Sequence, residues 1–280
     1  KILSENTDDG FVYRVDLRLR PDPSSNPICM GLLAAQRYYE NFGRNWERAA
    51  FIKARVIAGD NDTGFIFLKS LVPFIWRKNL DFATIEDIND IRRRIRKENP
   101  YSIGSSLLGY DIKTGMGGIR EIELFVQTQQ LIFGGRNKNL RIPGTVSTLK
   151  ELIRSRWIKK EHGLKLIECY ERLRIFEHIL QLREDKQTHS IPKDLSKLHD
   201  VAILLGEQNI EKFLDHVSEI LQSVHKIVGE LSFQLPSHLT YNHEQIQKEI
   251  EDNDVLSNYF AKWFGYRALK SERAIRIFDE

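Results

Sequence analysis

Apolar and charged side chains alternate along residues 11–20. The odd positions carry Phe11, Tyr13, Val15, Leu17 and Leu19, and the even positions from 14 onward carry Arg14, Asp16, Arg18 and Arg20. Because successive side chains of a β-strand point to opposite faces, this alternation predicts a strand that ends before Pro21. The charged face of this strand has two interpretations. It is either a solvated, salt-bridged surface or one part of a site that handles phosphate and a metal ion.

Beyond this strand, the apolar positions recur at helical spacing. The predicted helices cover residues 32–43, 45–58, 84–98, 119–133, 147–154, 161–188, 194–205, 208–235, 243–250 and 252–278. The longest, 161–188, carries apolar residues three and four positions apart, a pattern that requires partner helices. The second half of the chain is therefore predicted to form a helical bundle, with a domain border in the loop 140–146.

Composition and charge narrow the classes of function. The 280 residues include 42 Lys and Arg against 39 Asp and Glu, and a net charge of +3 is too small to indicate bulk binding of nucleic acid. Cys29 and Cys169 lie far apart, so we expect neither a disulfide framework nor a zinc site, as in a reducing cytoplasm. The sequence contains no apolar run of about 18 residues, so we expect no membrane span. The first strand begins so soon that we expect further residues before Lys1 in the intact protein.

The segment NWERAAFIKAR, residues 45–55, is a second candidate for chemistry. On a helix, Arg48 and Arg55 are seven positions apart and share a face, whereas Glu47 lies on another face. A basic face beside the first strand would extend a phosphate-handling surface. The alternative is a surface helix with ordinary charges.

A glycine-rich segment, residues 113–118, precedes the helix predicted from Ile119. Free N–H groups at a helix N-terminus favour anions, but glycines can equally allow two backbones to approach closely. Glu121 is a candidate acid beside this loop, or else a partner for Arg120 or another surface arginine. Three further polar residues on the same helix form a stripe between apolar positions: Glu123, Gln127 and Gln130.

Four segments occur in an order and at a spacing typical of one known family. They are DGFVYRVDLRLRP, YYENFGRNWERAAFIKARVIAGD, KTGMGGIREIELFVQTQQLIFGGR and EDKQTHSIP. Together they resemble glutamine synthetase adenylyltransferase, which attaches AMP to a tyrosine of glutamine synthetase and also removes it. The WER and GGIREIE motifs resemble its N-terminal, deadenylylating half. The resemblance, which covers roughly residues 8–235, implies a mainly α (α+β) fold with the C-terminal part of a nucleotidyltransferase palm in 1–145 and a helical bundle in 146–235. Residues 236–280 are predicted to be a helical extension or a linker toward a second half.

The family's functional residues carry over by motif. Asp16 matches the third catalytic carboxylate, a metal ligand. The positions matching phosphate- or nucleotide-binding segments are Arg18, Arg20, Arg48, Lys53, Arg55, Gly117, Gly118 and Glu121. The resemblance also implies Mg²⁺ or Mn²⁺, a nucleotide and inorganic phosphate as substrates, and glutamine synthetase and a PII-type signalling protein as partners in the cytoplasm, without nucleic acid or membrane.

One motif of the family is missing from this sequence. The GSDxD motif supplies the other two carboxylates of the metal site, and Gly104-Ser105-Ser106 lacks the aspartates. The resemblance implies removal of AMP by phosphorolysis, with adenylylation in the full-length enzyme, but we expect the 280-residue chain alone to be inactive. An alternative is a non-catalytic module that docks glutamine synthetase or a PII-type regulator. A nucleotidyltransferase acting on nucleic acid is disfavoured by the near-neutral charge.

Overall fold

The computed structural model of the chain describes residues 5–8, 10, 12, 15–17, 19–22, 26–77, 107–184 and 186–233. The helices predicted over 84–98, 243–250 and 252–278 lie outside these residues. The chain divides into two compact units, Lys1–Ser232 and Phe233–Glu280. Apart from the last residue of the final helix, the elements below belong to the first unit.

Four short helices form an N-terminal helical cluster. They are α1 (Leu32–Asn41), α2 (Asn45–Phe51), α3 (Asn61–Ser70) and α4 (Val72–Ile75). Asp60 caps α3, because its carboxylate accepts the backbone N–H groups of Asp62 and Thr63. The apolar core of this cluster is formed by Tyr39, Ile52, Leu71, Phe74 and Ile75, together with Leu131 of α6 (Ile119–Phe133). The N-terminal helices are therefore anchored to α6 through shared apolar surface.

The strand predicted over residues 11–20 is not seen in the part of the segment that the structure describes. Val15, Leu17 and Leu19 are 42%, 46% and 61% exposed instead of packing on a core. A strand depends on hydrogen bonds to a neighbouring strand, but the described residues pair only in isolated bridges, Thr7 with Gly10 and Asp111 with Ser190. The mainly helical fold is confirmed, whereas the palm predicted within residues 1–145 is not.

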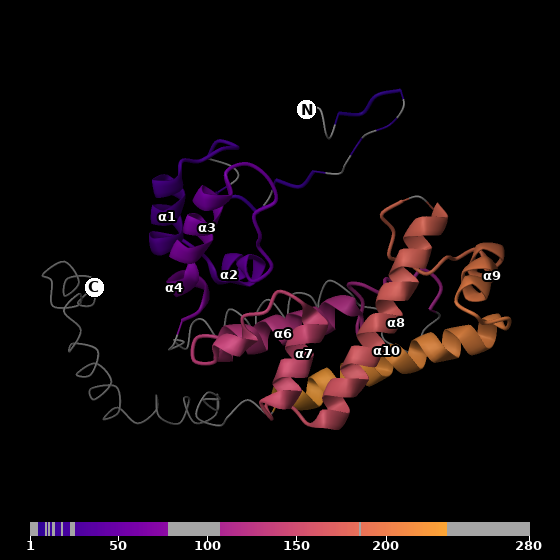
Figure 1. Cartoon of the computed structure of the whole chain (residues 1–280). Helices are drawn as coiled ribbons and strands as arrows, with labels where there is room; N and C mark the ends of the chain where they lie inside the picture. Colours follow the sequence, from indigo (N-terminus) through magenta and orange to yellow (C-terminus); the bar gives the residue numbers. More distant parts are fainter. Residues whose placement is uncertain are drawn as a thin grey trace, which may run out of the picture. The chain divides into compact units, whose positions relative to one another are not determined.

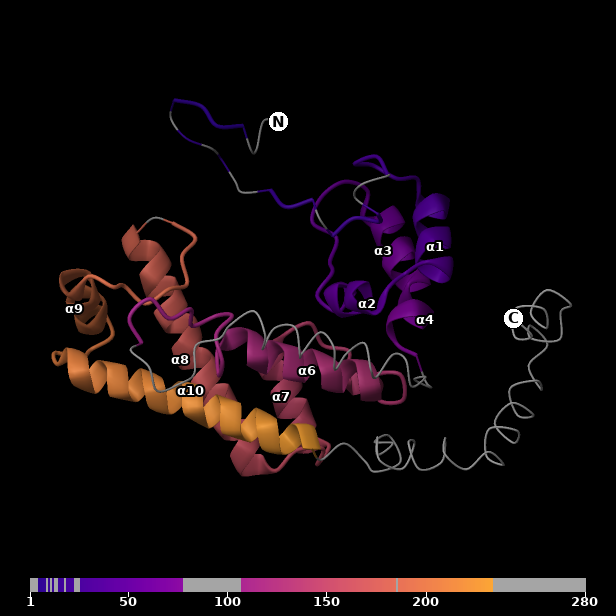
Figure 2. The same ribbon diagram turned by 180° about the vertical axis from the view of Figure 1, so that it is seen from behind.

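The helices after residue 118 form a bundle that includes α6 as well as the helices of the region 146–235. They are α6, α7 (Thr145–Arg154), α8 (Lys160–Glu184), α9 (Leu195–Leu204) and α10 (Ile210–Phe233). Figures 1 and 2 show α10 alongside α6 and α9 beside the C-terminal end of α8. Of the helices that the structure describes, none is both long and apolar enough to cross a membrane.

One apolar core holds the bundle together. Its fully buried side chains come from every helix of the bundle and include Ile119, Ile122, Leu149, Leu152, Leu166, Leu198 and Leu221. The core therefore continues across the domain border predicted between residues 145 and 146. This border stays a prediction, but α6 packs with the bundle that follows it.

Helix α2 is shorter than predicted. It ends at Phe51, whereas its sequence pattern suggested a helix to residue 58. The N–H groups of Lys53 and Ala54 bond carbonyls only three residues back, at 3.3 and 3.1 Å, which ends the α-helical pattern. Arg55 therefore follows the helix, and the prediction that it shares a helix face with Arg48 is wrong.

The bundle core yields a stability prediction. We expect Leu166→Ala to lower the free energy of unfolding by about 2–5 kcal/mol, because Leu166 is 0% exposed and its truncation leaves a cavity. Leu182→Ala is the matched control on α8, where the side chain is 82% exposed, and should change stability by less than about 0.5 kcal/mol. Urea unfolding of both variants measures the difference. Equal losses of stability would contradict the conclusion that Leu166 is buried and Leu182 is exposed.

Candidate functional site

A buried carboxylate on α6, Glu123, lies at the centre of a charged cluster. Its Oε1 accepts hydrogen bonds from Lys53 Nζ at 3.1 Å, Arg174 Nη2 at 2.7 Å and the Tyr170 hydroxyl at 3.2 Å. Arg120 Nη1 lies 3.9 Å from the other oxygen, Oε2. Lys53 lies just after α2 in the N-terminal helical cluster, while Tyr170 and Arg174 lie one turn apart on α8. We call these residues the Glu123 cluster.

Opposing effects act on the pKa of Glu123. Burial alone would raise the pKa of this carboxyl, since it disfavours the charged form. The positive charges of Lys53 and Arg174 outweigh burial, so the pKa is lowered and Glu123 is ionised at neutral pH. A buried carboxylate is tolerated here because it is paired and hydrogen-bonded.

Arg174 connects this carboxylate to a second one. Its Nη1 donates to Glu177 Oε2 at 2.6 Å, and its Nε donates to the Tyr170 hydroxyl at 3.1 Å. Burial would lower the pKa of Arg174, but the bonds to Tyr170 and Glu177 and the charge of Glu123 raise it above its ordinary value. The planar guanidinium thus uses all three of its nitrogens at once, which a lysine cannot do.

Glu177 extends the network toward the segment after α8. Lys113 Nζ and His189 Nδ1 each lie 3.2 Å from Glu177 Oε1, and the carboxylate is 2% exposed. Burial raises the pKa of Glu177, but the hydrogen bond and charge of Arg174 outweigh it and lower the pKa. A continuous series of ion pairs therefore runs from Lys53 through Glu123, Arg174 and Glu177 to Lys113.

The glycine-rich segment before α6 is closely packed. Gly117 has φ +74°, and a Cβ at this position would overlap the backbone of Leu221 on α10. Its N–H donates to Glu121 Oε2 at 2.7 Å, while the N–H groups of Gly118 and Ile119 bond Gly115 O and Ile112 O. These bonds favour the interpretation in which glycines allow two backbones to approach, since the same N–H groups are already occupied inside the protein.

Glu121 faces α10 and not an arginine. Besides accepting the N–H of Gly117, its carboxylate lies 3.2 Å from His225 Nδ1 on α10. Arg120 lies instead beside Glu123. Glu121 therefore joins the glycine segment to α10.

The remaining predicted site residues have other surroundings where the structure describes them. Arg48 is 0% exposed and donates to Asn45 Oδ1 at 3.0 Å and to Ile75 O at 3.2 Å, so it holds α2 against α4. Arg55 and Asp16 are exposed, and Arg20 is half-buried. Arg18 lies outside the described residues.

Sequence reasoning missed Arg174, Glu177 and Tyr170. A signal was present on α8, where positions 166, 170, 173, 177 and 180 share one face and two of these five are polar. A polar residue at a core position indicates a buried partner. Similarly, the polar stripe of α6 faces inward, since Glu123, Gln127 and Gln130 are all at most 8% exposed. The Gln130 amide bonds Leu140 O and Ile142 O and so holds the loop before α7.

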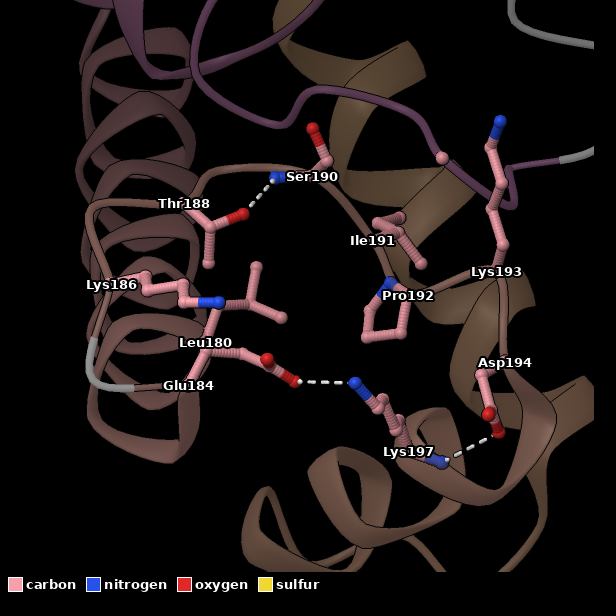
Figure 3. Close-up of a pocket in the computed structure, with 11 residues that line it drawn as sticks. Leu180, Glu184, Lys186, Thr188, Ser190, Ile191, Pro192, Lys193, Asp194 and Lys197 are labelled. Carbon is pink, nitrogen blue, oxygen red and sulfur yellow. Dashed lines mark hydrogen bonds and ion pairs between the residues drawn. The ribbon is translucent and has the colours of Figure 1, made fainter.

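A surface pocket of about 500 Å³ lies beside the C-terminal end of α8. Leu180, Ile191 and Pro192 form its apolar part, and Figure 3 shows Lys197 reaching toward Glu184, at 3.5 Å. The pocket is lined by residues of the EDKQTHSIP segment, whereas His189 of that segment pairs with Glu177. One segment thus borders the pocket and closes the ion-pair network.

The described residues do not form a metal site. No group of three or more His, Cys, Asp or Glu side chains among them is arranged to hold a metal ion. Asp16 alone is a poor ligand set for Mg²⁺, which is usually held by more than one oxygen donor.

Comparison with known proteins gives matches over most of the chain. The family model described as glutamate-ammonia ligase adenylyltransferase matches residues 1–70, and the model described as GlnD PII-uridylyltransferase matches residues 89–232. The chain is 49% identical over 226 residues to the bifunctional glutamine synthetase adenylyltransferase/adenylyl-removing enzyme of Bartonella henselae, covering 81% of this chain and 23% of that protein. The enzymes of the same name from Caulobacter vibrioides and Rhizobium meliloti are 49% and 48% identical over 82% of the chain. The chain spans 23% of the length of these curated relatives.

The packing of Gly117 can be tested against a glycine of similar backbone conformation. Gly206 has φ +88° with open space around it, whereas Gly117 has φ +74° against Leu221. We expect Gly206→Ala to cost about 1–2 kcal/mol from the left-handed conformation alone, and Gly117→Ala to cost clearly more, because the backbone must move. Thermal and urea unfolding of both variants provide the comparison. Equal losses would show that α10 does not restrict this position.

The lowered pKa of Glu123 predicts a pH dependence of stability. A carboxyl whose pKa is lowered in the folded state stabilises the fold at pH values above the pKa of the unfolded state, about 4.3 for Glu. This stabilisation is lost as the pH falls through the lowered pKa of the folded state. We therefore expect the unfolding free energy of the wild type to fall more steeply below pH 5 than that of Glu123→Gln. Glu171→Gln, at an exposed position of α8, should keep the wild-type slope. Parallel slopes in all three proteins would exclude a stabilising charge on Glu123.

Proposed function

The chain belongs to the family of bifunctional glutamine synthetase adenylyltransferase/adenylyl-removing enzymes, and we propose that it forms part of the machinery that transfers AMP to and from glutamine synthetase. The observation that carries this proposal is the 49% identity over 81% of the chain. Within that family, the sequence motifs favour the deadenylylating half over the adenylylating half.

The proposed reaction is phosphorolysis of the adenylylated tyrosine. An oxygen of inorganic phosphate attacks the phosphorus of AMP, the bond from phosphorus to the tyrosine oxygen breaks, and that oxygen takes a proton. The products are ADP and unmodified tyrosine. Two anions meet in this step, so a site for it must neutralise negative charge where the phosphates approach.

Lys53 is the residue of the Glu123 cluster best suited to this task. Its side chain is 39% exposed, and only one of its three ammonium hydrogens is used by Glu123. The remaining donors are available to a phosphate oxygen. Arg18, Arg20 and Arg55 are proposed to supply further positive charge in the assembled site, while Arg48, Gly117, Gly118 and Glu121 support it through packing.

A divalent metal belongs to the proposal only at the level of the family. We propose that Asp16 contributes one carboxylate to a Mg²⁺ or Mn²⁺ site in the assembled enzyme. The described residues do not gather a complete ligand set, and we derive no step through a metal. The carboxylates that this sequence lacks are the reason to expect no activity from the isolated chain.

A second candidate function is a non-catalytic docking module. Leu33 and Phe42, on α1 and just after it, and Phe65 on α3 are 61–71% exposed, and exposed apolar surface often marks a protein interface. In this alternative the partner is glutamine synthetase or a PII-type regulator. Binding of the isolated chain to either purified protein, measured by calorimetry, separates docking from catalysis, since only docking survives without the missing carboxylates.

A chimeric enzyme tests the catalytic proposal. This chain would replace the matching 226 residues of the Bartonella henselae relative, and ADP release from adenylylated glutamine synthetase would be followed with phosphate and Mg²⁺. We expect the chimera to deadenylylate, and Asp16→Asn to abolish the reaction while leaving thermal unfolding unchanged, because it removes a charge with little change of volume. Asp8→Asn, at another exposed aspartate near the N-terminus, is the matched control and should stay active.

Two results would contradict the proposal. Full activity of the Asp16→Asn chimera would remove Asp16 from the site. ADP release by the isolated chain would show that the missing carboxylates are not required.

A further inference from the structure

The two closest cations of Glu123 differ in how firmly they are held. Arg174 uses Nε, Nη1 and Nη2 for three different partners, and its side chain is 29% exposed. Within the described residues, the Lys53 ammonium makes one hydrogen bond, to Glu123, and the Lys53 side chain is 39% exposed. Arg174 is thus held in place by three hydrogen bonds, whereas Lys53 loses only one hydrogen bond when its ammonium turns to another anion.

The burial of Glu123 makes this difference important. Its side chain is only 6% exposed, and a buried carboxylate that loses its counter-charge is strongly destabilising. If Lys53 were its only close cation, moving the ammonium toward another anion would leave Glu123 charged and unneutralised. With Arg174 at 2.7 Å and the Tyr170 hydroxyl at 3.2 Å, the carboxylate stays compensated when Lys53 leaves.

We propose that Arg174 is a positioning residue that keeps Glu123 neutralised, so that the Lys53 ammonium can turn from Glu123 to the phosphate group of a ligand. The inference rests on the proposed function, because that function places phosphate near Lys53. It assigns α8 an indirect role in phosphate handling, through the contact of Arg174 with Glu123 on α6. Tyr170 and Glu177 act with Arg174 by fixing the orientation of its guanidinium.

A purely structural role for Arg174 is the competing explanation. Arg174 joins α6 to α8, and its loss would then lower stability without changing the state of Lys53. The two explanations differ in what happens when the charge of Glu123 is also removed. In the positioning role, Glu123→Gln releases Lys53 even without Arg174, whereas a structural role predicts no such rescue.

The reactivity of the Lys53 amine measures its state directly. The full chain would be treated with an acetylating reagent, and the rate at Lys53 would be followed by mass spectrometry. The neutral amine attacks the acyl carbon of the reagent, the leaving group departs and the nitrogen loses a proton, whereas an ammonium held in a tighter ion pair has no free electron pair for this attack. We expect Arg174→Met to slow acetylation of Lys53 by about fivefold to tenfold, and Arg172→Met, at an exposed arginine on the same helix, to leave the rate unchanged.

The rescue follows from the same measurement. We expect the double variant Glu123→Gln/Arg174→Met to acetylate at Lys53 at least as fast as the wild type, and Glu123→Gln alone to acetylate faster than the wild type. Glu123→Gln keeps the shape of the side chain, so it tests the release of Lys53 even if Arg174→Met fails to fold. Unchanged rates in Arg174→Met, or a double variant as slow as Arg174→Met, would overturn the positioning role.

Inorganic phosphate separates this inference from the proposed function. In the wild type, added phosphate should slow acetylation of Lys53 by occupying its ammonium, and in Arg174→Met this protection should require about tenfold more phosphate. Protection that is equal in both proteins would overturn the role of Arg174 and leave the proposed function standing. No protection in the wild type, combined with the expected variant rates, would overturn the phosphate contact while showing that Arg174 controls Lys53.

Discussion

A carboxylate that is buried between helices must be neutralised, and much of this structure is organised around how Glu123 meets that requirement. Cations reach Glu123 from the end of α2, from α6 itself and from α8, so a single side chain joins the N-terminal helical cluster to the bundle. The apolar contact of Leu131 with the same N-terminal helices acts in parallel. Apolar packing supplies most of the cohesion, while the ion pairs determine which residues face one another.

The surroundings of Lys53 and of Asp16, two residues of the predicted site, differ in how well the structure defines them. Lys53 is bonded to the buried carboxylate of Glu123, which is in turn bonded to Arg174. Asp16 is exposed, and the strand proposed to carry it is not seen in the described residues. The catalytic proposal for Asp16 therefore depends on family membership, whereas the proposal for Lys53 also depends on geometry.

Local sequence patterns predicted the helices well and their tertiary contacts poorly. The periodicity of 161–188 predicted α8, and Gly134 follows the last residue of α6 as expected for a helix end. The end of α2 was missed because it coincides with contacts to residues far along the chain, such as the bond from Lys53 to Glu123, 70 positions away. Arg174 was missed for the same reason: nothing beside it in the sequence indicates a carboxylate on α6. For the glycine segment, the sequence left two interpretations open, and only the position of α10 distinguishes them.

The contact between Gly117 and Leu221 has a mechanical consequence. Leu221 lies midway along α10, and the pair of Glu121 with His225 lies one turn further on. Helix α10 also buries side chains along most of its length, from Phe213 to Leu231, so the bundle core holds it on both sides of Leu221. The helix therefore cannot tilt away from a larger side chain at position 117 without disturbing buried contacts at both of its ends, and the close approach at Gly117 fixes the distance between the glycine turn and α10.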